Sequence, residues 1–261
     1  MIREHQSGEE LRGKRKVEIS GGRAGYNSVS FTGVRYQVFS RLKNGKITTE
    51  TRLNNNVDKK INIILSKIPF VRSFSMVIEL IFQYWRRFLI ASIVLFLMEL
   101  IFNEKSNSIF LYTMPINGLE MILCLLVMAG LIIKVSPIGA YHSAEHQTST
   151  AYERNLVLTV EKVKTQPRTH KDCGTNLVIS FLICFSVLFS VFGDEVWVYF
   201  VSWSIGYELW KNEPKIVWES IVVIGKVAQY LLFTSKPSEK HLVVAIEAIT
   251  KLEKEELANE E

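Results

Sequence analysis

The stretch IFLYTMPINGLEMILCLLVMAGLII, residues 109–133, decides the fold class of this 261-residue chain. It holds one charged residue, Glu120, and exceeds the roughly 20 residues that a helix needs to cross a bilayer. Three shorter apolar runs, with Trp or Tyr nearby, occupy residues 88–102, 177–192 and 196–210. Such runs are uncommon in soluble folds, and aromatic residues gather at membrane surfaces. We therefore predict a mainly α, polytopic helical membrane protein with about four spans.

The distribution of basic residues predicts which segments face the cytoplasm. Residues 1–87 carry 17 Lys and Arg against 7 Asp and Glu, and residues 134–176 carry six basic residues. The short connections 103–108 and 193–195 carry one basic residue between them. Because cytoplasmic loops retain Lys and Arg, we expect both termini and segment 134–176 in the cytoplasm. The net charge of +5 then reflects topology and lipid headgroups, so a lipid bilayer is an expected partner and nucleic acid is not.

Composition divides the chain into seven segments. They are a disordered basic start (1–18), a cytoplasmic β-element (19–60), an amphipathic interfacial helix (61–87), spans one and two (88–134), a cytoplasmic metal-site loop (135–176), spans three and four (177–211) and cytoplasmic amphipathic C-terminal helices (212–261). In the β-element, Asn44-Gly45 predicts a hairpin, because both central residues of a type I′ turn need positive φ.

Two features of the C-terminal segment leave alternatives open. Residues 215–233 are apolar with sparse charge and are predicted to lie at the interface or on the bundle; as a fifth span they would bury Glu219 and Lys226 in lipid at high cost. The final helix is expected to begin after Ser238 and to carry one apolar stripe. That stripe needs a partner, either within the protein or outside it, and consists of Leu242, Ile246, Ile249 and Leu252.

The sequence HSAEH, residues 142–146, has the H-x-x-E-H pattern that binds a divalent metal in inverted zinc proteases. On a helix, His142 and His146 share a face, so both imidazoles can reach one cation while Glu145 stands beside it. Such proteases need a further ligand, and the downstream carboxylates are separated from the motif by two predicted spans. These carboxylates are Glu208, Glu213 and Glu219.

Closer ligands lie within the same loop. Glu153 follows His146 by seven residues, and His170 and Cys173 form an H-x-x-C pair of the kind that zinc favours. A closed shell would be a structural site and would use His142, His146, His170 and Cys173. Three protein ligands and a water would instead leave a catalytic position open. The expected cofactor is a divalent metal ion, with zinc preferred by these ligand types.

The chain resembles the YqhQ-like family of bacterial membrane proteins, on the stretches YHSAEHQTSTAYE and LTVEKVKTQPRTHKDCGTN and, more weakly, on GGRAGYNSV, PFVR and HLVVAIEAI. That family contains a domain of unknown function and is labelled a predicted metal-dependent enzyme. The resemblance implies a bacterial plasma-membrane location and site residues His142, Glu145, His146, Glu153, His170 and Cys173. The chain departs from the family pattern where Asn27 replaces an acidic residue, Arg23 replaces a glutamine, and Lys171-Asp172 replaces Pro-Arg.

These observations lead to three functional hypotheses. In the first, the metal staples the loop, and the protein is a scaffold or assembly factor for a membrane protein complex, which Asn27 favours. In the alternative, the chain is a metal-dependent hydrolase acting on a membrane-associated substrate at the cytoplasmic face, with Glu145 as the catalytic residue. An ion or proton pathway through the intramembrane carboxylates Glu99 and Glu120 is the third.

Overall fold

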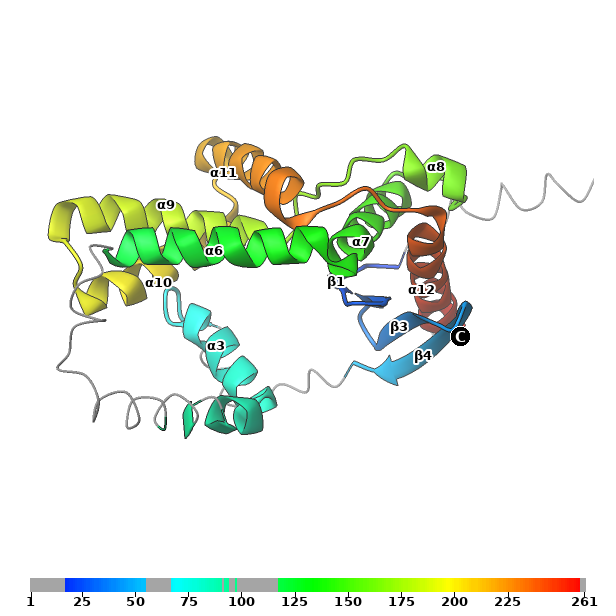
Figure 1. Ribbon diagram of the computed structural model, residues 1–261, viewed down its shortest axis with the longest axis horizontal. Helices are drawn as coiled ribbons and strands as arrows, with labels where there is room; N and C mark the ends of the chain where they lie inside the picture. The colour runs from blue at the N-terminus through cyan, green and yellow to red at the C-terminus, as the bar shows by residue number, and fades with distance from the viewer. Residues whose placement is uncertain (1–16, 55–66, 91, 94–96, 98–116, 259–261) are drawn as a thin grey trace, which may run out of the picture. The chain divides into compact units, whose positions relative to one another are not determined.

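The computed structural model describes residues 17–54, 67–90, 92, 93, 97 and 117–258 (Figure 1). Its elements are β1 (Gly21–Ala24), β2 (Ser28–Thr32), β3 (Tyr36–Lys43), β4 (Lys46–Leu53), α3 (Arg72–Gln83), α6 (Gly118–Val135), α7 (Pro137–Glu153), α8 (Val160–Lys164), α9 (Thr175–Phe192), α10 (Val196–Asn212), α11 (Lys215–Ala228), the π-helix η2 (Gln229–Phe233) and α12 (Glu239–Ala258). The prediction of a mainly helical chain with a small N-terminal β-element is confirmed.

Three helices in the described part of the chain are long and apolar enough to cross a membrane: Gly118–Val135, Thr175–Phe192 and Lys215–Phe233. The first two overlap predicted spans two and three, and each extends two residues beyond the predicted apolar run at its cytoplasmic-loop end. The third is the segment for which we preferred an interfacial position, and its length and composition suit either position. Predicted span one, Glu99, and residues 1–16 and 55–66 fall largely or wholly outside the described residues.

The four strands form an antiparallel sheet in the order β1-β2-β3-β4. The predicted hairpin is confirmed, because Lys43 pairs with Lys46 across a two-residue turn. Asn44 and Gly45 have φ values of 50° and 74°, the positive φ that a type I′ turn requires. The sheet buries Val29, Phe31 and Val38 on one face, as expected from a side-chain period of two.

Helices α7 and α12 pack on this sheet and on each other, and α8 packs on both helices (Figure 1). The stripe predicted on the last helix faces this core: Leu242, Ile249 and Leu252 are buried, and Ile246 packs against the same cluster. The stripe therefore finds its partner within the chain. These elements, with residues 126–135 and 222–233, form one compact unit, which we call the sheet unit.

A second compact unit comprises residues 58–125 and 177–221. Gly206 of α10 lies against the backbone of Phe181 in α9. The two helices approach closely at this point because glycine has no side chain. Arg72 at the start of α3 forms a bidentate ion pair with Glu208, at 2.8 and 2.5 Å, which accounts for one downstream carboxylate considered as a metal ligand. Glu120 and Asn117 cap α6 reciprocally, so Glu120 belongs to a helix end rather than to mid-span.

Glu256 of α12 offers a test of how the sheet unit holds together. Its buried carboxylate accepts hydrogen bonds from the backbone N–H groups of Arg35 and Tyr36, at 2.8 and 2.9 Å. We expect Glu256→Ala to lower stability by roughly 1–3 kcal/mol, because it removes a buried carboxylate that two partly buried backbone N–H groups share as their acceptor. The neighbouring Glu255→Ala removes a partly exposed i,i+4 ion pair with Lys251, a contact worth only a few tenths of a kcal/mol, so it should lower stability less (about 0.3–0.5 kcal/mol for that pair). Thermal unfolding of the two variants measures this difference, and equal melting temperatures would contradict it.

Candidate metal centre

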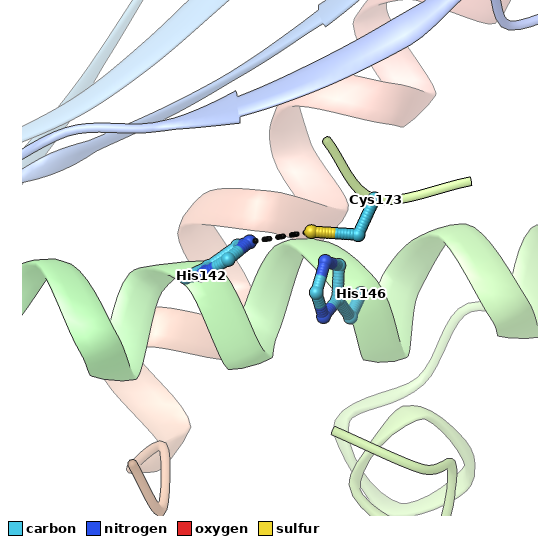
Figure 2. A group of neighbouring side chains, drawn as sticks. All are labelled: His142, His146 and Cys173. Atoms are coloured by element: carbon cyan, nitrogen blue, oxygen red, sulfur yellow. Dashed lines mark hydrogen bonds between the residues drawn. The ribbon is translucent and has the colours of Figure 1, made fainter. Parts of the chain in front are cut away.

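Helix α7 brings the two motif histidines together on one face. Ser136 caps its first turn and Pro137 occupies the first helical position, where a missing N–H costs nothing. One turn apart, the rings of His142 and His146 have centroids 4.3 Å from each other. The loop after α8 adds Cys173, whose Sγ lies 3.5 Å from His142 Nε2 (Figure 2). One ligand atom from each of these three residues lies within 4.8 Å of the others.

Backbone carbonyl groups orient both imidazoles. His142 Nδ1 lies 3.1 Å from the carbonyl oxygen of Phe233, and His146 Nδ1 lies 2.8 Å from that of Arg168. A carbonyl oxygen only accepts, so each Nδ1 carries a ring proton, and in the neutral ring the lone pair is on Nε2. This arrangement is the usual outer shell of a metal-binding histidine. The geometry therefore suits ligation through Nε2 of both residues.

The loop that carries Cys173 is fixed by a buried amide from η2. Gln229 Oε1 accepts from the backbone N–H of His170 at 2.8 Å, and its Nε2 donates to the His170 carbonyl at 3.0 Å. Farther along, Cys173 Sγ lies 3.3 Å from Thr175 Oγ1, which can donate to a thiolate. The hydrogen bonds of Gln229 and the contact with Thr175 together set the position of the Cys173 thiol.

Burial determines the charge states at this site. It raises the pKa of Glu145 to about 8, an effect that nearby His142 partly opposes. It also lowers the pKa of His146 well below its usual value, with His142 adding to the shift, so His146 is neutral near pH 7. The pKa of the Cys173 thiol is raised by burial as well. A divalent cation would reverse that preference, because it stabilises the thiolate that binds it.

Glu145 lies beside the ligand cluster, with Oε2 at 3.5 Å from His146 Nε2. Its side chain rests directly on strand β1, where Gly22 has no Cβ and a methyl group would overlap Glu145 Oε1. The sequence GGRAG thus has a role that sequence reasoning missed: one of its glycines makes room for the motif carboxylate. A signal was present, because paired glycines in a strand often mark a close approach.

The other predicted ligands form a neighbouring cluster. His170 Nε2 lies 3.1 Å from Glu153 Oε1, and His170 Nδ1 lies 3.8 Å from Asp172 Oδ2. The rings of His146 and His170 stack with centroids 5.9 Å apart. The structure therefore groups His170 with two carboxylates rather than with the thiol, and either cluster could hold a metal ion. Asp172 was not predicted as a ligand, although it lies between two residues that were.

Comparison with known proteins places the chain in a family. Residues 36–255 match the model of a family described as "Protein of unknown function (DUF1385)". The chain belongs to this family. Over 265 residues it is 24% identical to the uncharacterized protein YqhQ of Bacillus subtilis (strain 168), in an alignment covering 95% of this chain and 80% of that protein. The predicted resemblance is thereby confirmed, for a divergent member. No solved structure matches the chain.

The contact between Gly22 and Glu145 can be tested by a pair of alanine variants. We expect Gly22→Ala to destabilise the chain by about 1–3 kcal/mol, because the added methyl group forces the buried carboxylate away from β1. Gly21→Ala is the matched control, since a Cβ there meets nothing within 4 Å. Thermal unfolding compares the two. Equal destabilisation would mean that the strand itself, and not the contact with Glu145, requires glycine.

Proposed function

We propose that this chain is a metal-dependent hydrolase of the bacterial plasma membrane, with zinc held at the cytoplasmic face by His142, His146 and Cys173. The observation that carries the proposal is the convergence of these three ligand atoms within 4.8 Å, with both histidines already oriented by carbonyl groups. A site made of two imidazoles and one thiolate binds zinc in preference to magnesium or calcium.

Three protein ligands distinguish a catalytic site from a structural one, because a tetrahedral zinc ion then keeps a position for water or substrate. A bound zinc ion supplies Lewis acidity and lowers the pKa of its water. In the described residues His170 pairs with Glu153 instead of completing a four-ligand shell. Glu145, with a carboxylate oxygen 3.5 Å from His146 Nε2, is placed to hold a proton at the site.

A scaffold or assembly factor for a membrane protein complex is the second candidate. It is favoured by Asn27, which occupies a position where the family pattern has an acidic residue and donates to the carbonyl group of Leu42. Against it, the apolar stripe of α12, one of the surfaces that a partner complex would use, is covered by the chain's own sheet and α7. The hydrolase is therefore the better supported of the two.

Elemental analysis of the purified full-length chain tests the metal site. We expect one zinc ion per chain in the wild type and loss of zinc in His142→Ala, His146→Ala and Cys173→Ala. His170→Ala should retain it, because that side chain lies with Glu153 and Asp172. Loss of zinc from His170→Ala as well would indicate a closed four-ligand shell and favour the scaffold. A wild type without zinc after loading would refute both metal hypotheses.

Glu145→Gln separates the two functions once zinc is established. The variant should keep its zinc, since Glu145 is not one of the three grouped ligands. For a hydrolase, cells expressing it in place of the wild type should accumulate a membrane-associated molecule that the wild type removes. Comparing the membrane lipids and membrane proteins of the two cell lines would reveal it. A scaffold should leave both inventories unchanged in this variant.

Chain connectivity limits the membrane topology. Lys134 Nζ at the end of α6 donates to the carbonyl groups of Tyr230 and Leu231 in η2. Asn176 at the start of α9 lies against Gly225 of α11. These contacts, all within the sheet unit, support one common membrane side for the end of α6, the start of α9 and the end of η2. Between the start of α9 and the end of η2, the chain must therefore cross the membrane an even number of times. We propose that α9 and α10 cross and that α11 lies at the interface.

Cysteine labelling distinguishes this topology from its alternative, in which α11 crosses and α10 does not. In a background with Cys124→Ala and Cys184→Ala, a cysteine at Asp194 should react with an impermeant maleimide applied to intact cells in either case. A cysteine at Lys215 should react only after permeabilisation if α10 crosses back. Labelling of Lys215→Cys in intact cells would place the start of α11 outside and make α11 the returning span.

A further inference from the structure

A cavity of about 460 Å³ opens on the sheet unit between α7, the loop after α8, and the chain that follows α11. Its size is typical of sites for small ligands. Three basic residues line it, Lys164, Arg168 and Lys236, and no acidic residue does. Within the described residues no ion pair joins any of the three to a carboxylate. The cavity is therefore a concentration of positive charge without a counter-ion from its own walls.

The cavity wall is held in place by contacts that continue from the metal centre. Gln147, next to His146 on α7, donates through Nε2 to the carbonyl groups of Lys164 and Gln166, at 3.1 and 2.7 Å. The carbonyl group of Arg168 is bonded to His146 Nδ1 at 2.8 Å. Segment 164–168, which carries two of the basic residues, is thus bonded to α7 at both of its ends. A preformed site loses less conformational entropy on binding than a flexible loop would.

Arg168 and Tyr230 form the most specific part of the cavity. The guanidinium carbon of Arg168 lies 4.6 Å from the centroid of the Tyr230 ring. Stacking leaves the N–H groups at the edge of the guanidinium available for two parallel hydrogen bonds, the geometry that recognises phosphate oxygens. Lys164 and Lys236 are exposed and can add point charges to the same anion. The apolar part of the wall, which includes Pro237, suits an organic group attached to the phosphate.

The position of Tyr230 suggests where this phosphate comes from. Tyr230 lies in η2, at the end of the apolar segment Lys215–Phe233, for which we proposed an interfacial position, and half of its surface is exposed. Tyrosine side chains gather at headgroup level in membrane proteins, and basic pockets at that level bind anionic headgroups.

We propose that this cavity binds a phosphate ester, supplied by the headgroup of an anionic phospholipid. The site is separate from the three metal ligands. Only the lipid source rests on the membrane location in the proposed function; the recognition of phosphate does not.

Binding of a fluorescent short-chain phosphatidylglycerol to the full-length protein in neutral detergent tests the proposal. The pocket variant carries Lys164→Gln and Lys236→Gln. The control carries Lys162→Gln and Lys240→Gln, which remove the same charge from exposed neighbours outside the cavity. At about fivefold per basic residue, the pocket variant should bind about 25-fold more weakly, and the control should match the wild type. Equal affinity in all three proteins, or equal weakening in both variants, would overturn the proposal.

Competition identifies the source of the phosphate. Unlabelled phosphatidylglycerol should displace the probe, whereas phosphatidylcholine should not, because its headgroup carries no net charge. If inorganic phosphate or glycerol phosphate displaces the probe at similar concentrations, the cavity binds a free phosphate compound, and the phosphate assignment stands without the lipid. Failure of phosphatidylglycerol itself to displace the probe would overturn it.

Zinc content, measured on the same samples, keeps this test independent of the proposed function. A wild type that holds zinc but binds no phosphatidylglycerol would overturn the cavity proposal alone. One that binds phosphatidylglycerol without zinc would overturn the metal site alone.

Discussion

Helix α7 buries His146, a glutamate, a glutamine and several hydroxyl groups in its middle turns and partly buries His142, where most helices of this length place apolar residues. A buried polar group costs free energy unless it finds a hydrogen-bond partner. The surrounding segments supply several of these partners: Phe233 and Arg168 through their carbonyl groups, and Ser235 as the acceptor for Ser143 at 2.6 Å. The need to satisfy this one helix explains why loops distant in the sequence meet around it.

The same requirement links the metal centre to its surroundings. His146 uses one ring nitrogen to fix the loop at Arg168 and leaves the other for a cation. Its neighbour Gln147, which lines the cavity, fixes the same loop through the carbonyl groups of Lys164 and Gln166. A single turn of α7 thus supports both the candidate metal site and the basic cavity.

The choice between the proposed hydrolase and a scaffold depends on how many protein side chains would coordinate a bound metal ion. The ligand types alone permit both, since zinc accepts three or four protein ligands. In the structure His170 faces Glu153 and Asp172, while its backbone is held by Gln229. A rotation of the His170 ring toward Cys173 would have to break the contact with Glu153. The contact with Glu153 therefore opposes a four-ligand shell that includes His170.

Several features were predictable because they depend on short-range patterns. The apolar runs predicted long helices, Asn44-Gly45 predicted the hairpin with its positive φ values, and the i,i+4 spacing put His142 and His146 on one face. The stripe on α12 required a partner, and its period is visible in the sequence.

By itself, then, the sequence determined the element types, the family resemblance and the identity of the candidate ligands. Only the tertiary structure decided that Cys173 and not His170 joins the two motif histidines, that Gly22 makes room for Glu145, and that three basic residues meet in one cavity. These outcomes depend on contacts between segments far apart in the chain, and no local periodicity encodes which segments will meet.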